Sequence, residues 1–151
     1  MNFYTSVIAK SSLFHSLESI RALDLLEPVM RSAVQAILAD AKGLGLPFMV
    51  VETYRSCERQ EALFEQHATS LRTVGVHHYG LACDFAKDVG GEPSWKGDFS
   101  LLGVLARKHG LVWGGTWTHP CDPDHVQRCA VDDQDGLFAG TWYPDAAYLP
   151  F

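Results

Sequence analysis

Apolar positions along the chain follow helical and extended patterns in turn. Between residues 26 and 42 they recur at steps of three and four, which predicts a helix. The residues on this stripe are Leu26, Val29, Met30, Val34, Ile37 and Leu38. Gly43 and Gly45 predict the end of this helix. Residues 47–51 then form a short apolar run rich in β-forming side chains, which predicts a buried strand.

The middle of the chain continues in short elements. Ser56 is a good N-cap for a short helix over residues 57–66. Residues 67–76 are polar and predict a loop, and residues 79–86 predict a strand. Residues 88–97 hold three glycines and a proline and therefore predict another loop.

The last third contains one more predicted helix and two more strands. Asp98 or Ser100 could cap a helix that Gly110 ends, and residues 111–113 predict a strand. Residues 116–124 predict a loop with two prolines, and residues 125–127 a short strand. The tail is aromatic, and we expect it to pack over the core. Its aromatic residues are Phe138, Trp142, Tyr143, Tyr148 and Phe151.

Helices and strands therefore alternate irregularly, without an internal repeat or a linker. This pattern predicts the α+β class. The length of 151 residues suits a single domain over residues 1–151. A chain of this size can still bury about 70% of its unfolded surface.

Charge and hydropathy exclude several classes of partner. The net charge of −6 argues against nucleic acid, whose binding depends on Lys and Arg. The sequence contains no run of 18 apolar residues, so it predicts no segment that would insert into a membrane. The first residues lack the basic and apolar regions of a secretory leader, so we expect synthesis in the cytoplasm. We expect a monomer.

Four cysteines occur, and none forms a CxxC pair that would suggest a cysteine zinc site. They are Cys57, Cys83, Cys121 and Cys129. Free thiols are expected in a cytoplasmic protein. A disulfide between Cys121 and Cys129, which lie on either side of His125, is the alternative.

The segment from His77 to Asp84 has the first candidate chemistry. On a strand, Gly80, Ala82 and Asp84 would share one face, while the other face would be apolar and point to the core. Asp84 would then stand behind two small residues, with room in front of it. His77 is an odd number of residues from Asp84, so either Gly80 bends the chain or His77 precedes the strand.

A second group surrounds His125. Asp122 lies three residues earlier, and the turn at Pro123 could bring it alongside His125. Asp124 should point away if the strand begins at His125. Two histidines and one carboxylate match a catalytic zinc, which keeps three protein ligands and one open position. A general base must reach the attacking water without binding the metal, and Asp122 is the candidate.

These segments, taken in order, resemble peptidase family M15, the D-alanyl-D-alanine carboxypeptidases and L-alanyl-D-glutamate endopeptidases, including phage endolysins. The family pattern His-x-x-Gly-x-Ala-x-Asp followed by Asp/Glu-x-x-His is similar to residues 77–84 and 122–125. Residues 54–64 resemble its Tyr-Arg-Ser segment, and residues 110–117 its Gly-x-x-Trp-Gly-Gly-x-Trp segment. The resemblance covers residues 26–127. His78 departs from it, because Asn is common there, and the Gly80 register favours His77 over His78 as the ligand.

The resemblance implies a role for each matching residue. His77, Asp84 and His125 would hold one Zn²⁺ per chain, and Asp122 would be the catalytic acid and base. Arg55 would hold the substrate or stabilise the oxyanion; the alternative from the residues alone is an ion pair with Glu52 or Glu58. Further substrate contacts would come from Gln60, Trp113 and Trp117.

The implied fold is a small antiparallel sheet flanked by helices, as in the D-Ala-D-Ala peptidases and the Hedgehog domain. The implied activity is zinc-dependent hydrolysis of peptidoglycan stem peptides, first as an L-alanyl-D-glutamate endopeptidase and second as a D-alanyl-D-alanine carboxypeptidase. A cytoplasmic origin fits a phage lysis enzyme that reaches the cell wall after release. A non-catalytic zinc-binding module or a virion structural component is the remaining alternative.

Overall fold

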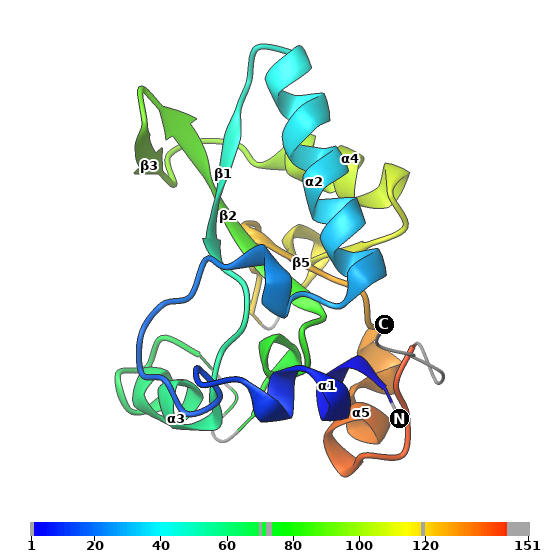
Figure 1. The fold of residues 1–151 in the computed structure, drawn as a ribbon. Coiled ribbons are helices and arrows are strands. Elements are labelled where there is room, and N and C mark those ends of the chain that lie inside the picture. Colours follow the sequence, from blue (N-terminus) through cyan, green and yellow to red (C-terminus); the bar gives the residue numbers. More distant parts are fainter. Residues whose placement is uncertain (1, 70, 72–73, 119, 145–151) are drawn as a thin grey trace.

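An antiparallel sheet with helices around it forms the frame of the protein (Figure 1). The computed structural model describes residues 2–69, 71, 74–118 and 120–144. Within them the sheet has the strand order β1-β2-β5-β4, with β3 paired to the far end of β2. The strands are β1 (Phe48–Glu52), β2 (Ala82–Val89), β3 (Glu92–Ser94), β4 (Val112–Trp113) and β5 (His125–Gln127). The predicted α+β fold is confirmed.

Two helices, α2 (Pro28–Gly43) and α4 (Ser100–Lys108), lie together on one face of the sheet (Figure 1). The apolar stripe predicted for the first helix, except for Val29, which is exposed, meets the buried face of β2, where Cys83 and Phe85 are fully buried. The side chains of Met30, Val34, Ile37, Leu102 and Ala106 complete this core. The apolar face predicted for the strand before Asp84 therefore does point at the core.

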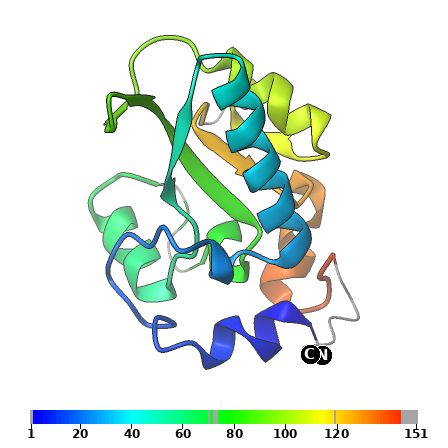
Figure 2. The same ribbon diagram turned by 45° about the horizontal axis from the view of Figure 1, so that its top comes forward.

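Shorter helices surround the opposite end of the sheet, away from the β2–β3 hairpin (Figure 1, Figure 2). They are α1 (Phe3–Ser6), α3 (Cys57–Glu65) and α5 (Gln134–Ala139). Ser56 caps α3 as predicted, since its side chain accepts a hydrogen bond from the Arg59 amide. The sequence patterns predicted neither α1 nor α5, because each has six residues or fewer and shows no full apolar period.

The strand predicted at residues 79–86 is shifted toward the C-terminus. A 3₁₀ turn, η3 (Val76–Tyr79), precedes it and ends at Gly80, whose φ of +73° suits glycine. A Cβ atom at position 80 would also lie 2.7 Å from the carbonyl oxygen of Leu25. β2 then extends to Val89 and pairs with β3, so the loop predicted at residues 88–97 is wrong in part. Gly90 and Gly91, both with positive φ, turn this hairpin.

The aromatic tail packs over the core as expected, as far as Tyr143. Phe138 stacks on Tyr79, and the Tyr143 hydroxyl donates a hydrogen bond to the Tyr79 carbonyl oxygen. Tyr148 and Phe151 lie outside the described residues. Among the helices that the structure describes, none combines the length and apolar character needed to cross a membrane.

Candidate metal centre

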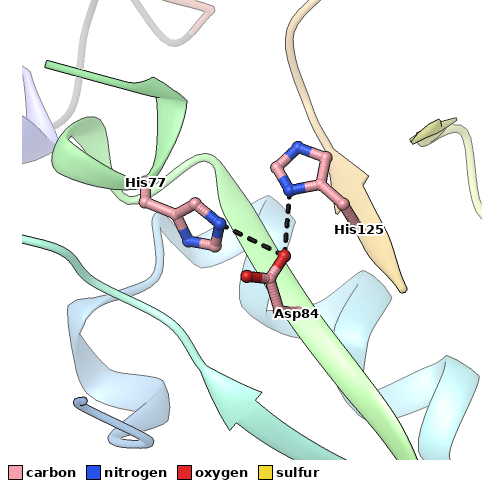
Figure 3. A group of neighbouring side chains, drawn as sticks. All are labelled: His77, Asp84 and His125. Carbon is pink, nitrogen blue, oxygen red and sulfur yellow. Dashed lines mark hydrogen bonds and ion pairs between the residues drawn. The ribbon is translucent and has the colours of Figure 1, made fainter. Parts of the chain in front are cut away.

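Three side chains from three different elements meet at the start of β2 (Figure 3). His77 comes from η3, Asp84 from β2 and His125 from β5. Strand pairing explains part of this arrangement, because Asp84 and His125 are direct partners across β2 and β5. One ligand atom from each residue lies within 4.8 Å of the other two. The structure thus brings together the residues for which the sequence predicted metal binding.

A backbone carbonyl fixes the orientation of the His77 ring. Its Nδ1 lies 2.7 Å from the carbonyl oxygen of Thr53, to which it donates a hydrogen bond. A neutral imidazole carries one proton, so Nε2 is left with a lone pair. Nε2 is buried without a hydrogen-bond partner and points at Asp84, 3.3 Å from Oδ1.

In His125 the other ring nitrogen, Nε2, makes the hydrogen bond that orients the ring. Its Nε2 lies 2.8 Å from Oε1 of Gln127, an amide oxygen that can only accept. The proton therefore sits on Nε2, and Nδ1 faces Asp84 Oδ1 at 2.9 Å. Two lone pairs this close need a proton or a cation between them.

The electrostatics of the cluster agree with a cation site. Burial alone would raise the pKa of Asp84, but His77 and His125 outweigh it and hold that pKa well below its usual range. Burial alone would lower the pKa of His125, whereas the hydrogen bond and charge of Asp84 raise it. Two imidazole nitrogens and one carboxylate oxygen facing each other are the donor set that zinc prefers. An unpartnered buried nitrogen aimed into the cluster shows that the residues fit such an ion.

Arg55 holds the second oxygen of Asp84. Its Nη2 lies 3.3 Å from Asp84 Oδ2 and 2.6 Å from Glu52 Oε1. The ion pair with Glu52, which the sequence left as an alternative role, is therefore present, and Glu58 pairs with His15 instead. The Arg55 guanidinium keeps Oδ2 occupied, so that Oδ1 is left to face the histidines.

Gln60 supports Arg55 from inside the protein. Its Oε1 accepts a hydrogen bond from Arg55 Nη1, and its Nε2 donates to Thr69 Oγ1 and to the carbonyl oxygen of Leu71. Only 2% of Gln60 is exposed. A substrate contact was predicted for Gln60, but both ends of its amide are used within the protein, so it acts on the site through Arg55.

Asp122 lies at the exposed side of the cluster. Its Oδ2 is 3.9 Å from His125 Nδ1, and 42% of its side chain is exposed. Asp124 is half-buried beside Asp122, and its orientation away from His125 stays a prediction. Burial and the neighbouring carboxyl groups of Asp122 and Asp84 raise the pKa of Asp124 to about 8. Asp122 is the carboxylate with access to solvent beside the ligands.

The Trp-Gly-Gly segment builds the wall next to Asp122. A Cβ atom at Gly114 would lie 2.4 Å from the Asp122 carbonyl oxygen, so only glycine allows this approach. The indole of Trp113 packs against Gly115 and donates a hydrogen bond to the Pro123 carbonyl oxygen at 2.7 Å. Trp113 therefore shapes the turn that carries Asp122.

Trp117 stands beside the ligands themselves. Its ring lies 5.4 Å from the ring of His125, centroid to centroid, and the residue is half-buried. Of the two tryptophans predicted to contact substrate, Trp117 is the one next to a candidate ligand. The four cysteines are free thiols, and Cys121 is exposed whereas Cys129 is buried.

Sequence reasoning missed the residues that hold the ligands. Thr53 acts through its backbone carbonyl, which carries no side-chain signal. Gln127 lies two residues after His125 on a strand, so both side chains share a face. That alternation could have identified Gln127 as a partner of His125.

Comparison with known proteins places these residues in context. Residues 69–128, which include the three candidate ligands and Asp122, match a family model described as D-alanyl-D-alanine carboxypeptidase. The chain is similar to the peptidoglycan L-alanyl-D-glutamate endopeptidase CwlK of Bacillus subtilis (strain 168), with 26% identity over 121 residues, 68% of this chain and 72% of CwlK.

Solved structures share the fold. The L-Ala D-Glu endopeptidase ChiX of Serratia marcescens has a TM-score of 0.61 and 25% identity, over 77% of this chain and 94% of ChiX. The vancomycin-resistance D,D-pentapeptidase VanY in complex with Zn(II) has a TM-score of 0.53 and 14% identity, over 76% of this chain and 78% of VanY. At this lower identity the second match speaks for the fold alone.

Proposed function

Because the chain is a metallopeptidase of the M15 family, we propose that it is a zinc-dependent endopeptidase that cuts the L-alanyl-D-glutamate bond of peptidoglycan stem peptides. The observation that carries the proposal is the cluster of the buried His77 and His125 with the partly buried Asp84, and the half-exposed Asp122 beside it. CwlK and ChiX, named for this bond, support the choice of substrate.

The ligand set would leave one coordination position free. His77 Nε2, Asp84 Oδ1 and His125 Nδ1 would hold the ion. When bound, zinc supplies Lewis acidity that polarises the scissile carbonyl and makes water a better nucleophile. A structural zinc site usually closes its fourth position with a protein ligand, so a three-ligand set favours catalysis.

Asp122 would act as the general base and then as the general acid. Its carboxylate would take a proton from the attacking water and pass it to the leaving amine. Its exposure lets it meet a substrate, and its place beside His125 lets it act without binding the metal. A non-catalytic zinc module would have no use for such a carboxylate.

Arg55 would act mainly through Asp84. Its bonds to Glu52, Gln60 and Asp84 turn most of its donors inward. A carboxypeptidase must receive the free carboxylate of its substrate, usually on a cation, and Arg55 is poorly placed for that task. This favours an endopeptidase over the D-alanyl-D-alanine carboxypeptidase that the family model describes. Direct contact of Arg55 with the substrate or oxyanion stays a prediction.

The test is digestion of purified peptidoglycan by the zinc-loaded protein, with and without a chelator. The endopeptidase hypothesis predicts new D-glutamate amino termini, detected by labelling and mass spectrometry, and no such termini after chelation. Free D-alanine would instead identify the carboxypeptidase. Failure to release either product from walls of several chemotypes would rule out both activities.

A matched pair of variants separates catalysis from metal binding. Asp122→Asn should bind zinc and release no product, whereas the exposed Asp132→Asn should behave as wild type. A non-catalytic module would bind zinc in all three proteins and cleave with none.

A further inference from the structure

Helix α5 lies beyond the part of the chain that the family model matches, yet it reaches the metal centre through hydrogen bonds. The match ends at residue 128, and α5 begins at Gln134. Gln134 Oε1 accepts a hydrogen bond from Gln127 Nε2 at 3.0 Å. Gln127 Oε1 in turn accepts a hydrogen bond from His125 Nε2. We propose that Gln134 is a positioning residue that sets the tautomer of His125 for metal binding.

The orientation of the Gln127 amide is the central step. An amide has one accepting and one donating end, and nothing in its shape distinguishes them. The Cys129 carbonyl oxygen, at 2.6 Å, and Gln134 Oε1 both accept from Gln127 Nε2. Two acceptors on one side hold the nitrogen there and turn Oε1 toward His125.

The orientation matters because it decides which His125 nitrogen is free. With Oε1 facing Nε2, the ring keeps its proton there and offers Nδ1 to the metal, next to Asp84. A flipped amide would aim two N–H bonds at the protonated nitrogen, which is unfavourable. Gln127 is 1% exposed, so water cannot easily replace a lost partner. Gln134 therefore stabilises the tautomer that the site requires.

Gln134 differs from Cys129 in how it can be tested. The Cys129 acceptor belongs to the backbone, whereas the Gln134 acceptor can be removed by substitution. Gln134 is half-buried on a short helix, so its replacement should leave the fold intact. Partners of this kind in other metal sites change metal affinity by about 10–100-fold. Since the Cys129 carbonyl remains, we expect the lower end of that range.

The experiment compares Gln134→Leu with Gln134→Glu. Leucine fills similar space without an acceptor, and glutamate keeps an oxygen for Gln127 Nε2. Zinc affinity is measured by competition with a chromogenic chelator, and ring tautomers by long-range ¹H–¹⁵N correlation of the histidines in the zinc-free protein. Asp135→Ala, in the same helical turn and exposed, is the control.

We expect Gln134→Leu to weaken zinc binding about tenfold and to broaden or shift the His125 ring signals while those of His77 stay in place. Gln134→Glu and Asp135→Ala should bind as wild type. Equal affinities and unchanged His125 signals in Gln134→Leu would overturn the proposal, as would an equal loss in Gln134→Leu and Gln134→Glu.

The inference rests on the proposed zinc site, and different results would contradict the proposed function and the role of Gln134. If wild-type protein binds no zinc, the proposed function fails. If wild type binds zinc tightly and Gln134→Leu matches it, only the role of Gln134 fails.

Discussion

Two neighbouring histidines occupy opposite kinds of environment. His77 faces Asp84 with an unpartnered ring nitrogen, whereas His78 points into an aromatic cluster formed by Tyr4, Phe14 and Tyr54. Both are 4% exposed, so burial does not distinguish them. Their surroundings do, because His77 donates to a carbonyl and faces a carboxylate, while the hydrogen-bond partners of His78 include two tyrosine hydroxyls.

The difference shows what converts a buried histidine into a candidate ligand. The Tyr4 hydroxyl lies 2.8 Å from His78 Nε2, and the Tyr54 hydroxyl and the Arg55 carbonyl oxygen lie 3.3 Å from Nδ1. Burial lowers the pKa of His78, which keeps the ring neutral. Because both of its nitrogens already have hydroxyl, thiol or carbonyl partners, His78 stabilises the fold, and of the two histidines His77 is the one available to a metal ion.

Asparagine substitution of the two histidines gives the largest expected contrast. His77→Asn removes a ligand, so zinc binding and peptidoglycan cleavage should both be lost. His78→Asn should keep zinc affinity and activity while lowering the melting temperature, since a buried hydrogen-bonded ring is lost. Chelator competition and thermal unfolding of both variants measure this. Loss of zinc by His78→Asn with retention by His77→Asn would reverse the assignment.

Asp122→Ala tests the proposed general base beside the metal centre that contains His77. General acid–base groups typically contribute about 10²–10⁴-fold to rate, so kcat should fall by that factor. Zinc affinity should stay close to wild type, because Asp122 lies beside the ligands rather than among them. A variant with full activity would shift the role to Asp124, whose pKa the neighbouring Asp122 helps to raise.

Glu52→Gln tests how the site holds Asp84. Glu52 is 4% exposed and accepts hydrogen bonds from both Arg55 and Arg59. The neutral amide should hold Arg55 less firmly and so weaken its hydrogen bond to Asp84. We expect zinc affinity to fall about tenfold, as for other residues behind a metal ligand. Glu58→Gln is the matched control, because Glu58 forms a salt bridge with the exposed His15. The same small change in both variants would show that Glu52 has no special role.

Tyr4→Phe should have the smallest effect and leave the metal site untouched. It removes the hydroxyl from the hydrogen bond with His78 and should lower the free energy of unfolding by about 1 kcal/mol. Urea unfolding of the zinc-free protein measures this loss. A change in zinc affinity would contradict the separation of the two histidines.

Local patterns predicted much of the site. The spacing around Gly80 selected His77 over His78, and the predicted turn at Pro123 brings Asp122 near His125. These features depend on residues within a few positions of each other, so strand alternation and turn chemistry reveal them. The residue types themselves limit the choice of ion.

The parts that sequence could not predict depend on distant contacts. The Thr53 carbonyl contacts His77 across 24 residues, and the Gln134 side chain contacts Gln127 behind His125, only after folding. The aromatic cluster around His78 draws Tyr4 from α1, a helix of four residues without periodicity. No local sequence pattern predicts such contacts, because many other residues of the same type could form them equally well.

The most direct test of the account is anomalous diffraction at the zinc edge from crystals of the zinc-loaded protein. We predict one peak per chain, about 2.0–2.2 Å from His77 Nε2, Asp84 Oδ1 and His125 Nδ1, with Asp122 outside bonding distance. A peak beside His78 and Cys57, or no peak between His77 and His125, would contradict the central claim.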